Sequence, residues 1–135
     1  MAYAQWVYIL IHNLCKSDLM IKNVVLNWGK FYKWDNKDDE ISVGDMEGTV
    51  VKPGRSSDMA SCGRSDASSG CEGSFEVFCS DTKVCRIYFS CPWGSKTNTF
   101  TVGGIDDDYM VQFQGANLDS GALGKVDVKI MSIPK

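Results

Sequence analysis

Short apolar segments separated by turn-forming residues are the feature that most constrains what this chain can fold into. Apolar residues recur with a period of two or in short continuous runs, and no segment keeps the helical period of 3.6 residues. Pairs such as Pro53-Gly54 and Gly103-Gly104 interrupt these runs at the short intervals typical of sandwiches and barrels. We expect strands at residues 5–12, 20–27, 30–34, 47–51, 58–62, 74–79, 84–89, 97–102, 109–114 and 125–132. The pattern predicts one all-β domain that spans residues 1–135.

The length and the charge of the chain exclude several classes of protein. One compact domain of 135 residues, 44% of them hydrophobic, can bury a sizeable core. No apolar run approaches the ~18 residues that a membrane-spanning helix needs. The net charge of −3 argues against binding to a nucleic-acid backbone and against electrostatic docking on anionic lipid. A membrane target must therefore be recognised by something other than its negative charge.

The N-terminal apolar run from Trp6 to Ile11 resembles the core of a signal peptide at first sight. It has no positively charged segment before it and no small-residue cleavage site after it. Its bulky and β-branched residues instead suit a first strand that is buried on both faces. We therefore expect a protein made without a signal peptide, located in the cytoplasm or released extracellularly, and peripheral on target membranes.

Six cysteines, at positions 15, 62, 71, 79, 85 and 91, leave the thiol chemistry open. They could pair in 15 ways, but a chain of this length does not need cross-links, and the expected compartment is reducing. We expect mostly free, buried thiols, with one or more disulfides as the alternative. Zinc is disfavoured because there is no Cys-x-x-Cys pair and His12 is distant in sequence.

The candidate catalytic groups all have simpler interpretations. His12 ends the first expected strand, where a structural hydrogen bond suits it, and residues 63–67 start like a nucleophile elbow but lack its closing glycine. The three acids at 106–108 are typical of a solvated loop. Residues 35–39 mimic part of a calcium loop, but Glu40 occupies the glycine position. We expect no enzyme activity, no cofactor and no bound metal.

Two aromatic segments say more about function. Trp28-Gly29-Lys30 and residues 91–96 (Cys-Pro-Trp-Gly-Ser-Lys) each place an indole beside a glycine and a cation. Indoles suit a membrane–water interface and can hold an ammonium group, and Lys96 or Arg64 can donate charge-assisted hydrogen bonds to phosphate. Such a set fits a zwitterionic phospholipid headgroup. The alternative is that these tryptophans pack between two sheets.

Five blocks in sequence order resemble the aegerolysin family. They are residues 1–6 (MAYAQW), 28–30 (WGK), 62–70 (CGRSDASSG), 91–99 (CPWGSKTNT) and 117–124 (NLDSGALG). The resemblance implies an antiparallel β-sandwich similar to actinoporins. It also implies a lipid-binding protein that recognises membranes through particular sphingolipids: sphingomyelin with cholesterol, or ceramide phosphoethanolamine. Several members act as the targeting half of a two-component cytolysin, in which a partner with a MACPF domain makes the pore.

The resemblance also suggests site residues. The interfacial tryptophans of the family match Trp6, Trp28 and Trp93, and its lysine matches Lys96. Some members carry an acid where this chain has Ser69. The family often reads Trp-Asp-Cys-Pro-Trp where residues 89–93 read Phe-Ser-Cys-Pro-Trp, so one indole and one carboxylate are missing and the lipid preference stays open.

These observations together predict a lipid-binding rim. We expect Trp28 and Trp93 on the membrane-facing end with Trp6 nearby, while Lys96 and Arg64 engage phosphate. Polar groups of residues 95–98 would contact the ceramide amide and hydroxyl. The alternatives are a stand-alone pore former and a carbohydrate- or protein-binding module, and weak self-association stays open.

Overall fold

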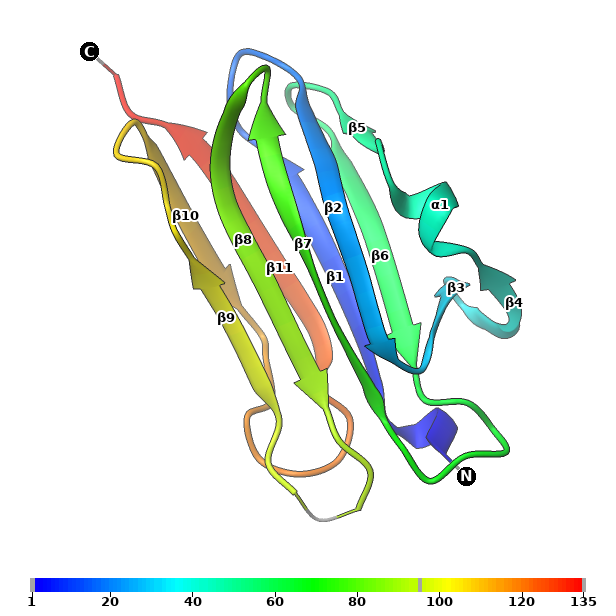
Figure 1. Ribbon diagram of the computed structural model, residues 1–135. Coiled ribbons are helices and arrows are strands. Elements are labelled where there is room, and N and C mark those ends of the chain that lie inside the picture. The colour runs from blue at the N-terminus through cyan, green and yellow to red at the C-terminus, as the bar shows by residue number, and fades with distance from the viewer. Residues whose placement is uncertain (1, 95, 135) are drawn as a thin grey trace.

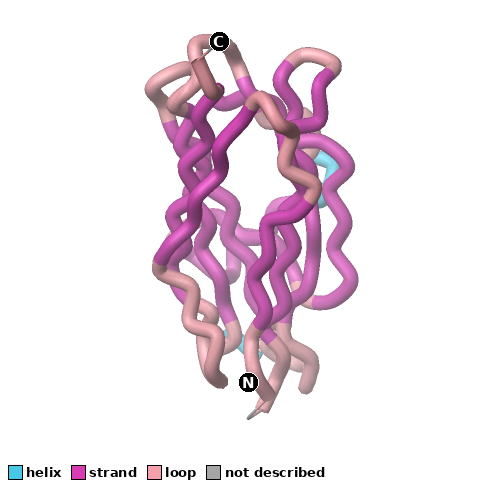
Figure 2. The backbone as a smooth tube through the Cα atoms, turned by 90° about the vertical axis from the view of Figure 1, so that its left-hand side faces the viewer, coloured by secondary structure: helices cyan, strands magenta, loops and turns pink. Residues whose placement is uncertain are grey.

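The computed structural model describes residues 2–94 and 96–134, which form two β-sheets packed face to face (Figures 1 and 2). The strands are β1 Trp6–Asn13, β2 Leu19–Trp28, β3 Lys30–Lys33, β4 Asn36–Ile41, β5 Val50–Val51, β6 Ser56–Cys62, β7 Cys71–Cys79, β8 Thr82–Cys91, β9 Thr99–Gly103, β10 Tyr109–Gln114 and β11 Gly124–Ser132. One sheet has the order β10-β11-β1-β6-β3-β4 and the other β5-β2-β7-β8-β9. The predicted all-β sandwich is confirmed.

All strand pairs are antiparallel except β1 and β11, which run parallel in the middle of the six-stranded sheet. In β1 the exposed and buried residues alternate. Val7, Ile9 and Ile11 are fully buried between the sheets, whereas Trp6, Tyr8 and Leu10 are half-buried on the outer face. The prediction that this strand is buried on both faces is therefore wrong for its outer face, because no third layer covers the sheet there.

The core lies between the two sheets and consists mainly of aromatic and branched side chains. Its largest fully buried members include Phe31, Phe75 and Phe89. Full burial of one such side chain contributes roughly 1.5–3 kcal/mol. The core therefore holds the two sheets as one rigid support for the loops at their ends.

No strand was expected between residues 34 and 47, yet residues 36–41 form the edge strand β4. The chain reverses at Trp34-Asp35, so that β4 pairs back onto β3. The strand is polar on both faces because it lies at the sheet edge, where charged residues also discourage pairing with other chains. Apolar alternation could not reveal it.

The strand expected at 47–51 is shortened to β5 because a helical turn, α1 (Val43–Met46), precedes it. Ser42 caps this turn, and its side-chain oxygen accepts a hydrogen bond from the backbone N–H of Asp45 at 3.1 Å. The other helical segment is the short 3-10 turn η1 (Ala2–Ala4). Neither helix in the described part of the chain has the length and apolarity needed to cross a membrane.

A bulge in β2 explains why residue 23 has a left-handed backbone conformation. Asn23 has φ +54°, and the pairing of β2 with β7 shifts at this point. The carboxylate of Glu47 accepts hydrogen bonds from the N–H groups of Asn23 and Val24, both at 2.8 Å. These contacts satisfy two donors that the shifted ladder leaves free.

The thiols and the histidine have structural positions. All six cysteines carry free thiols, and all but Cys79 are buried. The described residues contain no cluster of three or more metal-binding side chains. His12 contacts Asp127 at 2.8 Å and Ser56 at 2.7 Å, which confirms the structural hydrogen bonding expected for it.

Candidate functional site

Three chain segments meet at the lower end of the sandwich in Figure 1: the β2–β3 junction, the β6–β7 loop and the β8–β9 loop. They enclose a shallow cleft of about 290 Å³. Its lining residues are Trp28, Ser68, Ser69, Gly70, Cys71, Glu72, Ser90, Pro92, Trp93 and Lys96. The cleft therefore brings together four residues that the sequence singled out: Trp28, Ser69, Trp93 and Lys96.

Gly29 is the reason that Trp28 projects from the end of β2. The chain passes here from one sheet to the other, and Gly29 has φ +84°. A Cβ at this position would lie 2.5 Å from the carbonyl oxygen of Cys62 and 2.8 Å from the Cβ of Cys71. Only glycine permits this close crossing. Because the strand ends abruptly, the Trp28 side chain remains 57% exposed.

Gly70 joins the other two loops of the cleft. A Cβ on Gly70 would lie 1.8 Å from the carbonyl oxygen of Cys91, so the β6–β7 loop passes in direct contact with the start of the β8–β9 loop. Trp93 lies two residues after Cys91 in this loop and is 41% exposed. The alternative that Trp28 and Trp93 pack between the sheets is therefore wrong, because both indoles open to solvent at one end.

The cleft contains one cation and one fixed carboxylate. Lys96 is exposed, and no acidic side chain of the described residues forms an ion pair with it. Glu72 accepts hydrogen bonds from Asn27 at 2.8 Å and from the Tyr88 hydroxyl at 2.6 Å. Burial of the phenol, together with this hydrogen bond to Glu72, raises the pKa of Tyr88 above its ordinary value.

Sequence reasoning missed Glu72. Glu72 lies opposite both Trp28 and Ser90 across the sheet, a position that depends on strand pairing and that no local motif signals. The family pattern drew attention to acids missing at 69 and 90 instead. The structure places a carboxylate between those two positions.

The structure contradicts the expected ligand contact of residues 95–98 for Asn98. Asn98 is 4% exposed, and its amide donates to the carbonyl oxygens of Asn117 at 2.9 Å and Gly121 at 3.0 Å. It therefore ties the β8–β9 loop to the 117–121 segment and cannot contact a ligand. Thr97 is exposed, and Ser95 lies outside the described residues.

Trp6 and Arg64 do not line the cleft. Trp6 lies on the outer face of the six-stranded sheet, where its ring centre is 5.4 Å from that of Trp34. Arg64 makes two hydrogen bonds to the carboxylate of Glu40, at 3.0 and 2.9 Å, and this contact lowers the pKa of Glu40. The guanidinium is thus already paired with an acid on β4.

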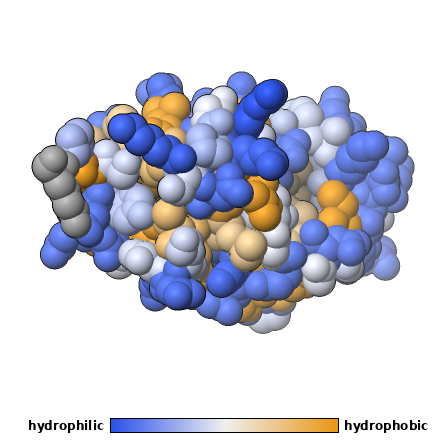
Figure 3. Space-filling view, turned by 90° about the horizontal axis from the view of Figure 1, so that it is seen from above, coloured by the Kyte–Doolittle hydropathy of each residue, from blue (hydrophilic) through white to orange (hydrophobic). Residues whose placement is uncertain are grey.

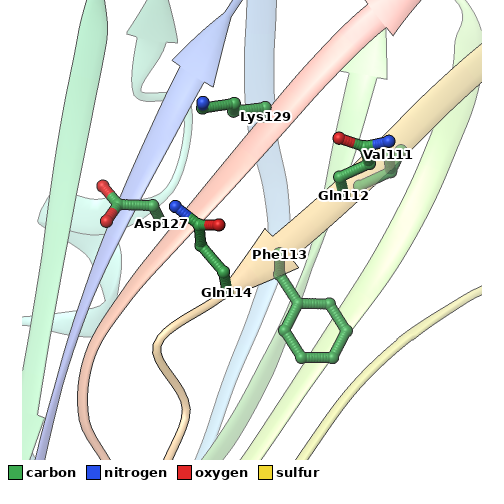
Figure 4. A pocket seen from close by; sticks show the side chains of 6 residues that line it. All are labelled: Val111, Gln112, Phe113, Gln114, Asp127 and Lys129. Carbon is green, nitrogen blue, oxygen red and sulfur yellow. The ribbon is translucent and has the colours of Figure 1, made fainter.

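A second pocket, of about 370 Å³, lies on β10 and β11 (Figure 4). Asp127, one of its two charged residues, is held by His12 at 2.8 Å. The ring of Phe113 packs at 4.9 Å from that of Phe100. None of the residues that the sequence singled out lines this pocket.

The upper end of the molecule is mostly hydrophilic, with apolar spots that are separate from one another (Figure 3). The cleft at the lower end is therefore the better candidate.

Comparison with known proteins decides the family. The family model described as Aegerolysin matches residues 4–133. The chain belongs to the aegerolysin family. This aegerolysin is 47% identical over 131 residues to ostreolysin A6 of Pleurotus ostreatus, with 95% of each chain covered. It is 46% identical over 130 residues to Asp-hemolysin of Aspergillus fumigatus, with 96% of this chain and 94% of the relative covered.

Among solved structures, this aegerolysin resembles the RahU protein, crystallised in complex with a TRIS molecule. The two superpose with a TM-score of 0.93 and 34% sequence identity over 99% of both chains. The resemblance stated from the five sequence blocks is thereby confirmed.

Proposed function

We propose that this aegerolysin binds the headgroups of membrane sphingolipids through the cleft at its lower end. The observation that carries the proposal is the gathering of two exposed indoles, an unpaired ammonium and a fixed carboxylate in one cleft of about 290 Å³. A net charge of −3 makes general attraction to an anionic surface a poor explanation for membrane binding. The proposed role is binding without catalysis.

The charges of the cleft complement a zwitterionic headgroup. The Lys96 ammonium would bind the phosphate by charge-assisted hydrogen bonds. The Glu72 carboxylate and the indole faces would bind the primary ammonium of ceramide phosphoethanolamine or the quaternary ammonium of sphingomyelin. Ser68, Ser69 and Ser90 line the same cleft and offer hydroxyls to the ceramide amide and hydroxyl.

The two indoles would also anchor the protein in the interface. Trp28 and Trp93 are 57% and 41% exposed, so each still has apolar surface to bury. Burying most of one indole contributes on the order of 1.5–3 kcal/mol. Two such anchors plus the polar contacts are enough for micromolar binding after the cost of association.

Trp6 and Arg64, also expected at the site, would have supporting roles. Trp6 packs beside Trp34 on the outer face of the six-stranded sheet, so it could contact the membrane only beside the cleft. Arg64 would hold the β6–β7 loop through its ion pair with Glu40, at 2.9 Å, rather than bind phosphate itself. The effect of replacing either residue should therefore be smaller than that of replacing Trp28 or Trp93.

We further propose that the bound protein is the targeting component of a two-component cytolysin, with a MACPF-domain protein as the partner that makes the pore. The relatives include one named a hemolysin. Dye release from sphingolipid vesicles measures the division of labour directly. We expect none from this chain alone, and release by this chain alone would favour the stand-alone pore former.

A liposome panel tests the lipid target. Vesicles of phosphatidylcholine alone, with sphingomyelin, with sphingomyelin and cholesterol, and with ceramide phosphoethanolamine are sedimented with the protein. We expect pelleting only with the sphingolipids. Equal pelleting with plain phosphatidylcholine would contradict headgroup recognition, and competition by free glycans would favour a carbohydrate-binding module.

Two variants test the charge complement on the same panel. Glu72→Gln keeps the shape of the side chain and one of its two acceptor oxygens but removes its charge. Lys96→Gln removes the cation. We expect each to weaken pelleting with sphingolipid vesicles about tenfold, the effect of one charge-assisted hydrogen bond. Lys83→Gln, a change in an ion pair at the other end of β7 and β8, is the control.

A further inference from the structure

Two cysteines face each other beneath the cleft. Cys71 is the first residue of β7 and Cys91 the last of β8, and they are direct partners in the antiparallel register. Both point into the core, with exposures of 1% and 0%. Cys71 also lines the cleft, so the pair lies at the base of the loops that carry Ser69 and Trp93.

The register places the two thiols at a distance that a disulfide can bridge. Directly opposite residues of an antiparallel pair have Cα atoms about 4.5 or 5.5 Å apart, according to the type of pair. Both values lie within the roughly 4.4–6.8 Å that disulfides span. The Cys71 thiol donates to the Gln5 carbonyl oxygen at 3.7 Å, and the neighbouring Cys91 raises the pKa of Cys71.

The other four cysteines have no cysteine opposite them in the strand register. Cys85 lies in the middle of β8, opposite Val77, and burial alone raises the pKa of its thiol to about 12. Cys62 lies in the other sheet, opposite Trp6 and Lys30. Among the strand partners of the described residues, only Cys71 and Cys91 form a cysteine pair.

We propose that Cys71 and Cys91 are a redox-active pair that a peroxide converts into a cross-strand disulfide at the base of the cleft. The site is independent of the proposed lipid target, because it follows from strand register alone. The adjacent Cys71 side chain lowers the pKa of Cys91, which favours Cys91 as the first thiolate to react.

The reaction balances with hydrogen peroxide as the oxidant. The Cys91 thiolate attacks one peroxide oxygen, the O–O bond breaks, and the sulfur becomes a sulfenic acid while hydroxide leaves and takes up a proton to form water. The Cys71 sulfur then attacks the sulfenic sulfur, the S–O bond breaks, and a second water leaves. Two thiols and one peroxide thus give one disulfide and two waters.

The disulfide would change how the loops of the cleft are held. The Cys91 thiol now donates to the carbonyl oxygen of Gly121 at 3.3 Å, and the Cys71 thiol lies 3.7 Å from that of Gln5. A disulfide has no hydrogen to donate, so both contacts are lost. In exchange the cross-link closes the β7–β8 hairpin, and we expect the midpoint of thermal unfolding to rise by about 5–10 °C.

Mass spectrometry tests the pair. The native protein is treated with hydrogen peroxide or with dithiothreitol, then unfolded in iodoacetamide and digested. After peroxide we expect four alkylated cysteines, a loss of two hydrogen atoms and one linked peptide pair that contains Cys71 and Cys91. Six alkylated cysteines, or a disulfide between any other two, would overturn the proposal. So would a linked protein that unfolds at a lower temperature than the reduced one.

Matched variants separate the pair from general oxidation. Cys91→Ser should give no linked peptide, whereas Cys85→Ala, which removes a buried thiol from the same strand, should keep it. Circular dichroism confirms that each variant is folded before treatment. A linked peptide that persists in Cys91→Ser, or is lost in Cys85→Ala with an unchanged spectrum, would contradict the assignment. Because these measurements contain no lipid, their outcome is distinguishable from that of the liposome panel.

Discussion

Gly29→Ala tests whether the crossing between the sheets requires glycine. Two costs add at this position. The backbone has φ +84°, and an L side chain in the left-handed region costs roughly 1–2 kcal/mol. The added Cβ would also lie 2.5 Å from the Cys62 carbonyl oxygen and 2.8 Å from the Cys71 Cβ, and neither atom belongs to the end of a flexible side chain. Relieving such crowding costs about 1–3 kcal/mol.

Gly48→Ala provides the matched control because Gly48 has nearly the same backbone conformation. Its φ is +82°, and no heavy atom lies within 4 Å of a Cβ built there. It should therefore lose only the backbone cost, about 1–2 kcal/mol, against about 2–5 kcal/mol for Gly29→Ala.

Urea-induced unfolding, followed by far-ultraviolet circular dichroism, measures both free energies. The difference between the two variants isolates the crowding at Gly29. Equal losses of stability would refute the reasoning, because they would mean that Cys62 at the end of β6 and Cys71 at the start of β7 can move away from residue 29 at no cost. A loss below 0.5 kcal/mol for both, about the noise of such a measurement, would refute the backbone argument as well.

Three further predictions concern other parts of the fold. Glu47→Gln should lower the free energy of unfolding by about 1 kcal/mol, because the N–H groups of Asn23 and Val24 in the β2 bulge lose a charged acceptor. An unchanged midpoint of urea unfolding would contradict this prediction. The ion pair with Arg64 lowers the pKa of Glu40, so the small contribution of this pair to stability is present above the ordinary carboxyl pKa and is lost as the pH falls through the lowered pKa. The free energies of unfolding of Arg64→Gln and the parent, plotted against pH, should therefore converge in acid. A difference that stays constant with pH would exclude the ion pair as the cause. Burial, with a hydrogen bond to Asp58, raises the pKa of Tyr8 to about 12, so this phenol should stabilise the fold below pH 10 and lose that contribution toward pH 12. In an ultraviolet titration, Tyr8→Phe should lack one phenol that titrates late in the parent. Loss of a phenol that titrates near pH 10 would contradict this prediction.

Much of the fold could be predicted because apolar alternation reports burial. It placed β10 at residues 109–114 and found the other core strands to within a few residues. It failed for β4, whose position at a sheet edge leaves both faces polar, and for α1, which has one turn and a Ser42 cap but too few residues for a helical period.

The site was predictable to the extent that it depends on local motifs. The pairs Trp28-Gly29 and Trp93-Gly94 each end a segment abruptly, and the structure exposes both indoles. Glu72 was missed because its place in the cleft depends on which strands are neighbours. The pairing of Arg64 with Glu40 was missed for the same reason, since β4 was not expected to exist.

The most direct test of the central claim is the affinity of tryptophan variants for sphingolipid vesicles. Trp28→Ala and Trp93→Ala should each weaken binding by roughly 10- to 150-fold, as the loss of about 1.5–3 kcal/mol of indole burial implies. Trp34→Ala is the matched control, because Trp34 is 37% exposed but packs away from the cleft against Tyr8 of the six-stranded sheet, at 4.1 Å between ring centres. Its affinity should stay within a fewfold of the parent. Unchanged binding of the Trp28 and Trp93 variants, or an equal loss for the control, would contradict the assignment of the cleft.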